Sequence, residues 1–143
     1  MKELHAQYNA DGKGFQSNPD YPVIINERHF NRVRALIEDA RAKGATVIGG
    51  EYVPERRLVT PTVISNVTDD MKVMQEEIFG PVLCVVPWKD REDVVRIVAG
   101  RDKPLSLYIF SKDQAEIDYF LAHSTSGSTV VNHNVIQSGT NPY

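Results

Sequence analysis

The sequence predicts an α/β fold, a mainly parallel sheet with flanking helices. The chain has 143 residues, the length of one ordinary domain. The uniformly apolar stretch Val82–Val86 is typical of a parallel strand covered on both faces. From residue 82 onward, strand and helix patterns alternate, so we expect right-handed βαβ connections.

The elements of the first half follow from breakers and apolar spacing. We expect residues 1–21 to form an N-terminal segment, with a short helical start and a loop, and residues 22–143 to form the α/β core. A long helix should begin after Asn26, its N-cap, and end before Gly44. Its apolar residues recur at helical spacing: Phe30, Val33, Ile37 and Ala40. Ala45–Ile48 should form a short strand, and Leu58–Ile64 an edge strand or a bent extended segment, because it contains Pro61.

The second half repeats a strand and helix pattern. Asp90 should open a helix whose apolar side carries Val94, Val95, Ile97 and Val98. Leu105–Phe110 should form the next strand. Ser111 and Gln114 have the spacing of a capping box for the following helix, and Ser128–Val131 should form the last strand.

Composition excludes several classes of function. The chain is 41% hydrophobic and 24% charged with a net charge of −3, so it has no basic footprint for a nucleic acid partner. It has no apolar run near the roughly 20 residues that cross a bilayer, and its polar N-terminus lacks the core of a signal peptide. Cys84, the single cysteine, excludes an internal disulfide and fits a reducing, cytoplasmic setting.

Neither the cysteine nor the histidines make a convincing catalytic or metal site. Cys84 lies among valine and leucine, whereas a nucleophilic thiol needs an electropositive, partly exposed setting, so we interpret it as a core residue. No histidine has metal-ligand spacing, and we predict no metal site. His133 follows a strand end, where a solvated loop residue is favoured over a catalytic one. Gly12-Lys13-Gly14 lacks the remaining glycines of a phosphate loop.

The segment Glu76–Pro81 combines two carboxylates, an aromatic ring, a glycine and a proline. Carboxylates accept hydrogen bonds from hydroxyl groups, and an aromatic face can cover a flat ring, so the segment suits one end of a cofactor. The competing interpretation is a helix end and tight turn, with Glu76 and Glu77 as surface charges and Phe79 plugging the core. On physical grounds alone the second interpretation is favoured.

The same segment resembles the Glu-Glu-Ile-Phe-Gly-Pro signature of the NAD(P)-dependent aldehyde dehydrogenase superfamily. Further similarity covers essentially all of residues 19–140, in matching order, and is closest to the class 3 and coniferyl-aldehyde branch. It is carried by Tyr21–Phe30, Thr60–Val63, Lys103–Ser111 and Ser126–Asn132.

The resemblance implies a role for two residues. In the family a cysteine thiolate attacks the aldehyde, hydride passes to the nicotinamide, and water releases the acid. By position, Glu77 hydrogen-bonds the nicotinamide ribose and Phe79 packs near the nicotinamide ring of NAD or NADP. The nucleophile, oxyanion-hole asparagine, general base and dinucleotide-binding domain of the family lie upstream of the matched region. We therefore expect no catalytic residue here, and interpret residues 1–143 as a later part of the catalytic domain.

Several expectations follow from this resemblance. The intact enzyme would oxidise a small-molecule aldehyde, whereas the isolated chain would be inactive. The alternative is a non-enzymatic α/β binding or assembly module, since fold alone does not establish function. In the family, the sheet edge near Ser128–Val131 pairs with a partner subunit, so we expect a homo-oligomer, and self-association of the isolated chain.

Overall fold

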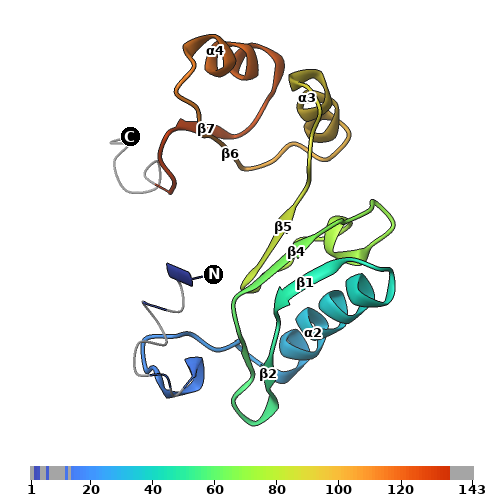
Figure 1. Cartoon of the computed structure of the whole chain (residues 1–143), viewed down its shortest axis with the longest axis vertical. Coiled ribbons are helices and arrows are strands. Elements are labelled where there is room, and N and C mark those ends of the chain that lie inside the picture. The colour runs from blue at the N-terminus through green and yellow to red at the C-terminus, as the bar shows by residue number, and fades with distance from the viewer. Residues whose placement is uncertain (1, 4–5, 7–11, 13, 136–143) are drawn as a thin grey trace. The chain divides into compact units, whose positions relative to one another are not determined.

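The computed structural model describes residues 2–3, 6, 12 and 14–135, so the expected helical start lies largely outside the described residues. The chain divides into two compact units, Met1–Pro87 and Trp88–Tyr143. Each unit combines helices with strands (Figure 1), which confirms the α/β class. Among the described residues, no helix has the length and apolar character that crossing a membrane requires.

The first unit is built on a sheet with the strand order β1-β4-β5. Its strands are β1 (Thr46–Gly49), β4 (Thr62–Ser65) and β5 (Val82–Val85). β4 runs parallel to β5 but antiparallel to β1, with Ile64 opposite both Val47 and Cys84. The sheet of this unit is therefore mixed rather than mainly parallel. The sequence prediction missed this because periodicity locates strands but carries no information on their direction.

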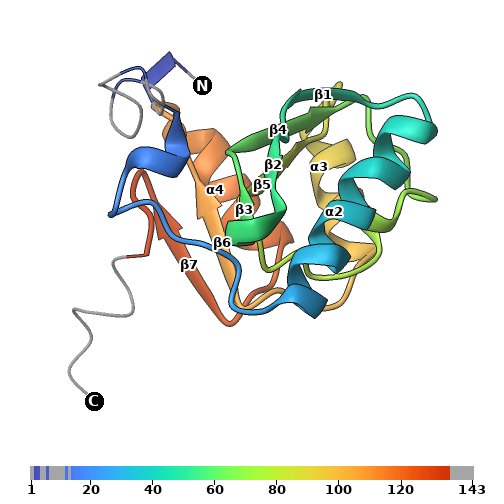
Figure 2. The same ribbon diagram turned by 90° about the horizontal axis from the view of Figure 1, so that it is seen from below.

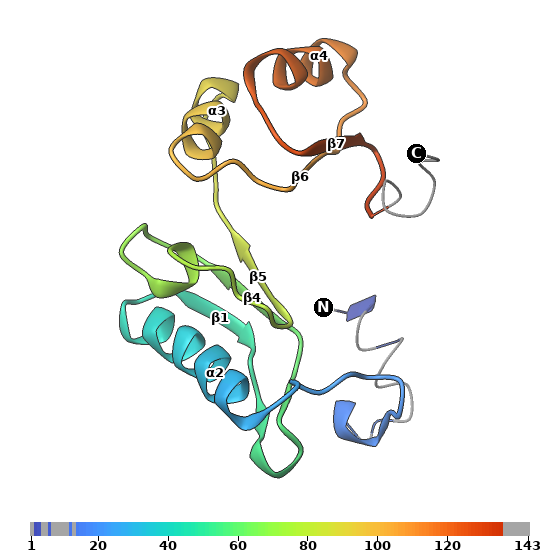
Figure 3. The ribbon, with the colours of Figure 1, turned by 180° about the vertical axis from the view of Figure 1, so that it is seen from behind.

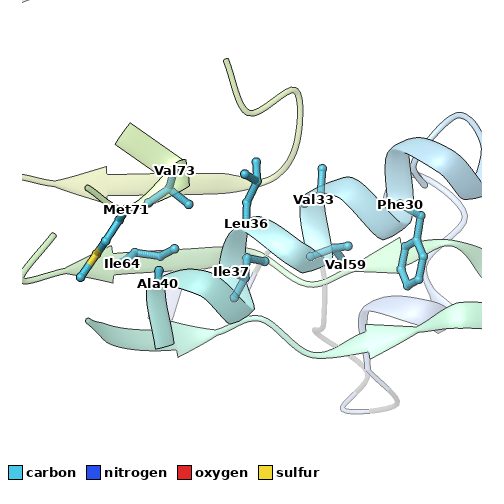
Figure 4. Close-up of a cluster of buried hydrophobic side chains, with 9 residues drawn as sticks. All are labelled: Phe30, Val33, Leu36, Ile37, Ala40, Val59, Ile64, Met71 and Val73. Carbon is cyan, nitrogen blue, oxygen red and sulfur yellow. The ribbon is translucent and has the colours of Figure 1, made fainter. Parts of the chain in front are cut away.

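Helix α2 (Glu27–Ala42) lies along one face of this sheet (Figure 3). The expected cap is confirmed: the Asn26 side chain accepts a hydrogen bond from the amide of His29 at 2.9 Å. Gly44, just past the helix, has φ = 90°, a conformation that glycine adopts without strain. The apolar residues of α2 at helical spacing face the strands (Figure 4). Together with buried residues of the segments packed against the helix they form the core of the unit: Phe30, Val33, Leu36, Ile37, Ala40, Val59, Ile64, Met71 and Val73.

A short antiparallel hairpin joins β1 to β4. It consists of β2 (Tyr52–Val53), the 3₁₀ turn η2 (Pro54–Arg56) and β3 (Leu58–Val59). Thr60 and Pro61 then separate β3 from β4, so the expected bent segment is correct, while β4 itself is a central strand. A second buried cluster (Phe15, Tyr21 and Leu58) attaches the turn η1 (Phe15–Ser17) to the hairpin, and Tyr21 Oη donates to the carbonyl of Val59 at 2.8 Å.

Strand β5 departs from the sequence prediction. Val82 and Cys84 pack against the core, but Leu83 and Val85 on the opposite face are 62% and 44% exposed. The prediction of a strand covered on both faces is therefore wrong for this unit. A uniformly apolar sequence shows that both faces of a strand can be buried, but it does not show which elements of the fold cover each face.

The second unit is a βαβ arrangement preceded by a helix. Its elements are α3 (Arg91–Ala99), β6 (Ser106–Ile109), α4 (Gln114–His123) and β7 (Ser128–Val131). β6 and β7 run parallel and side by side (Figure 2), as predicted for strands joined through a helix. The Asp90 side chain caps α3 by accepting from the amide of Asp93 at 2.9 Å, as expected.

The cap of α4 differs from the prediction. Asp113, not Ser111, accepts the capping hydrogen bond, from the amide of Ala115 at 2.9 Å. Ser111 instead accepts from the amide of Asp113 through its hydroxyl, while its main chain is bonded to Asn132. The helix consequently begins three residues after Ser111, at Gln114.

Candidate functional site: an anchored loop before strand β5

The segment Glu76–Pro81, here called the signature loop, has no regular secondary structure. It connects η3 (Lys72–Met74) to β5. Within it, Ile78 packs against the hydrophobic core, whereas Phe79 is 73% exposed. The interpretation in which Phe79 plugs the core is therefore wrong, because the neighbouring isoleucine occupies that place.

The backbone of Phe79 directs its ring outward. Phe79 has φ = 47°, in the left-handed region that residues with a bulky side chain rarely adopt. Such a conformation costs of the order of 1–3 kcal/mol and persists only where the surroundings impose it. The packing of half-buried Ile78 against the core on one side and the contact of Gly80 with Val33 on the other supply that constraint.

Gly80 brings the signature loop against helix α2. A Cβ placed on Gly80 would lie 3.0 Å from both Cγ atoms of Val33, which is fully buried. A side chain at position 80 would push the loop away from the helix, so glycine is required here for close approach rather than for a left-handed backbone.

Arg32 of α2 contacts three acceptors in the signature loop. Its Nη1 lies 2.8 Å from Glu76 Oε2 and 3.1 Å from the Glu77 carbonyl, and its Nη2 lies 2.5 Å from the Ile78 carbonyl. Sequence reasoning missed this residue. It is one of several arginines on the helix, and no local pattern links it to acceptors 44–46 positions away.

The turn that precedes the loop is also fastened to α2. The amide of Lys72 donates to Asp39 Oδ2 at 2.9 Å, and Lys43 Nζ lies 3.3 Å from Asp39 Oδ1. The hydrogen bond from Lys72 is the main reason that the pKa of Asp39 is lowered below its ordinary value, and Lys43 adds to the effect. The helix therefore holds both η3 and the signature loop.

The two predicted site residues are left facing outward. The Glu77 side chain is exposed, and its carboxylate makes no hydrogen bond or ion pair with the described part of the chain. The adjacent exposed ring of Phe79 offers an aromatic face. An acceptor for sugar hydroxyls and a flat apolar surface fit the ribose and ring of a nicotinamide nucleotide. Glu76, by contrast, is engaged with Arg32.

The remaining candidates take structural or surface positions. Cys84 is half-buried and packs against the core, as predicted. His133 is exposed, and its Nδ1 accepts from the amide of Asn134 at 3.0 Å. Across residues 2–3, 6, 12 and 14–135, no cluster of three or more His, Cys, Asp or Glu side chains has the arrangement of a metal site.

Asn132 stabilises the end of β7 in the second unit. Its Oδ1 accepts from the amide of Ser111 at 3.0 Å and its Nδ2 donates to the Ser111 carbonyl at 2.9 Å. Its backbone has φ = 54°, which asparagine tolerates better than most residues.

Comparison with known proteins identifies the class to which this fold and loop belong. A sequence profile of the aldehyde dehydrogenase family matches residues 2–143. A probable coniferyl aldehyde dehydrogenase of Caulobacter vibrioides is 46% identical over 138 residues, which are 92% of this chain and 28% of that protein. A putative aldehyde dehydrogenase, AldX, of Bacillus subtilis is 48% identical over 137 residues, covering 93% of this chain and 31% of that protein.

The structural comparison agrees. The structure described as the substrate-bound state of Staphylococcus aureus AldH superposes with a TM-score of 0.86 at 31% identity, over 96% of this chain and 29% of that one. The chain belongs to the aldehyde dehydrogenase family, which is a family of enzymes. It spans 28% and 31% of the length of the two curated relatives.

Proposed function

We propose that this chain is part of an enzyme that oxidises an aldehyde to a carboxylic acid with NAD or NADP. Within it, Glu77 and Phe79 form one side of the nicotinamide site. The observation that carries the proposal is the geometry of the signature loop, which packs half-buried Ile78 against the core, anchors Gly80 and leaves the Glu77 carboxylate and Phe79 ring exposed. Membership of the family favours an enzyme over the alternative of a binding or assembly module.

Each residue has a distinct task in this proposal. The nicotinamide cofactor, when bound, takes up the hydride that the aldehyde loses on oxidation. The Glu77 carboxylate accepts hydrogen bonds from ribose hydroxyls and thereby restricts rotation of the nucleotide. The Phe79 ring covers part of the flat nicotinamide and excludes water from it. Rates of hydride transfer depend steeply on such placement, so the contribution of the loop is orientation rather than chemistry.

We assign residues 1–143 to part of one catalytic domain, with 1–21 as an N-terminal segment and 22–143 as the α/β core. No catalytic residue is assigned to the chain, and the isolated chain should be inactive. The assay is NAD(P)H formation by the purified 143-residue chain with a panel of aldehydes. Sustained turnover would overturn this part of the proposal.

We further propose a cytoplasmic location and a homo-oligomer. A single cysteine supports a reducing compartment. β7 pairs with β6 and with no other strand among the described residues, so its other edge is open for pairing between chains. Light scattering of the purified chain should detect self-association, and a clean monomer at high concentration would contradict it.

The site assignment is tested with nicotinamide mononucleotide, which contains only the half of the cofactor that the loop would contact. We expect weak binding, of the order of millimolar, because a ribose contact and a ring contact supply little free energy. Backbone NMR shifts should change at residues 77–80 and less so with adenosine monophosphate. The variant Glu77→Ala should lose the response, whereas Glu55→Ala, which removes an exposed carboxylate elsewhere in the unit, should retain it. Equal responses to both nucleotides would refute the assignment.

A further inference from the structure

We propose that Arg32 is the positioning residue of the nicotinamide site: its guanidinium holds the backbone of the signature loop so that Glu77 and Phe79 face the cofactor. This inference rests on the function proposed above and goes beyond it, because it assigns to Arg32 an action on the loop rather than on the nucleotide. The carrying observation is a three-point contact of one side chain with three successive loop residues, Glu76, Glu77 and Ile78.

The carbonyls that Arg32 binds belong to irregular backbone. The oxygens of Glu77 and Ile78 accept from Nη1 and Nη2 at 3.1 and 2.5 Å, and no strand in the described part of the chain pairs with the segment that carries them. Two donors in one rigid plane fix the distance and the angle between these successive carbonyls. The orientation of the peptide planes on either side of Ile78 is thereby set, and with it the direction in which the next residue, Phe79, leaves the loop.

The ion pair with Glu76 orients the guanidinium itself. Glu76 Oε2 lies 2.8 Å from Arg32 Nη1, and the side chain of Arg32 is only 27% exposed. A carboxylate on one side limits rotation of the planar group and leaves its other donors directed at the carbonyls. This gives the first glutamate of the signature loop a task that is separate from that of Glu77.

Helix α2 makes the arrangement stiff. Arg32 and Val33 are consecutive on the helix, and Val33 is the wall against which Gly80 packs. The loop is consequently fixed to one rigid element at two points on either side of Phe79, by hydrogen bonds before it and by packing after it. A strained residue between two such anchors has little freedom to relax, which explains how Phe79 keeps φ = 47°.

The test compares loop order and nucleotide binding in four proteins: the wild-type chain, Arg32→Ala, Arg32→Lys and the control Arg28→Ala. Arg28 is an exposed arginine one turn earlier on α2. Backbone NMR order parameters at residues 76–80 should be near 0.85 in the wild-type chain and in Arg28→Ala, and should fall below about 0.6 in Arg32→Ala. The dissociation constant for nicotinamide mononucleotide should rise at least about fivefold in parallel, since the binding-competent conformation becomes less populated.

The lysine variant separates positioning from charge and from general stability. It retains the positive charge and most of the stem, but its ammonium cannot present a planar pair of donors, so we expect only partial rescue. Unchanged order and affinity in Arg32→Ala, or full rescue by Arg32→Lys, would overturn the inference. If loop order falls in Arg32→Ala but the wild-type loop never responds to the nucleotide, Arg32 positions the loop and the proposed function fails instead.

Discussion

Gly80→Ala is the sharpest test of how the signature loop is anchored to α2. The new methyl carbon would lie 3.0 Å from Val33 Cγ1 and Cγ2, and Val33 is 0% exposed. Favourable contact between carbon atoms requires about 3.5–4.0 Å, so loop and helix must separate by roughly 0.5 Å. Val33 cannot turn away at low cost, because a valine within a helix strongly prefers one rotamer.

The expected effect of Gly80→Ala on the free energy of unfolding is the balance of two opposing contributions. Overpacking of this kind typically destabilises by about 1–3 kcal/mol. Replacing glycine by alanine lowers the entropy of the unfolded chain, and where the backbone conformation is compatible this returns about 0.4–1 kcal/mol. Gly80 is not among the glycines with positive φ, so that second term applies. We expect a net loss of about 1–2 kcal/mol in the free energy of unfolding of the first unit.

The assay is hydrogen exchange of the core amides of α2, which reports on the first unit separately from the second. A loss of 1–2 kcal/mol corresponds to exchange that is about 5–30 times faster. The variant Val33→Ala should itself cost about 2–3 kcal/mol through lost burial and a cavity. In that background Gly80→Ala should be nearly neutral, because its methyl group enters the vacated space.

The double variant supplies the refutation. If the contact with Val33 is the cause, the two substitutions are non-additive by about 1–2 kcal/mol, with the double variant more stable than the sum of the single effects. Additive effects would show that the strain arises elsewhere. A wild-type exchange rate in Gly80→Ala would show that the loop does not depend on this approach.

Two further predictions concern the supports around the loop and at the end of β7. Because the hydrogen bond from Lys72 lowers the pKa of Asp39, the carboxylate stabilises the fold above about pH 4, and this contribution is lost as the pH falls through the folded-state pKa. Asp39→Asn should therefore be less stable than wild type near neutrality, with the difference shrinking in acid; a difference independent of pH in urea unfolding would contradict this. In the second unit, Asn132→Gly loses two side-chain hydrogen bonds to Ser111, and Asn132→Ala also places a Cβ at φ = 54°. Hydrogen exchange of the Ser111 amide should accelerate in both variants, and Asn132→Ala should be less stable than Asn132→Gly by about 1 kcal/mol in the free energy of unfolding. A glycine variant less stable than the alanine variant would refute the role of the backbone conformation.

Much of the local structure could be predicted because its causes are local. The Asn26 side chain and the recurrence of apolar residues locate α2, and Ser128–Val131 was predicted with the bounds that β7 has. Caps and periodicity involve residues within one or two turns of each other, so the sequence contains the complete cause. The predicted cap of α4 was wrong, because its cause is not local. The side chain of Asn132, 21 residues away, hydrogen-bonds the main chain of Ser111, and the helix begins at Gln114 instead.

The sequence by itself determined that the chain is α/β, that it belongs among aldehyde dehydrogenases, and that Glu77 and Phe79 are the residues to examine. The tertiary structure decided which neighbour of Phe79 enters the core, which face of β5 is covered, and that Arg32 and Val33 anchor the signature loop. The physical reason is the separation along the chain of the residues that interact. A motif records the chemistry of adjacent residues, whereas the direction in which their side chains point depends on packing and hydrogen bonds to a helix more than forty residues earlier in the chain.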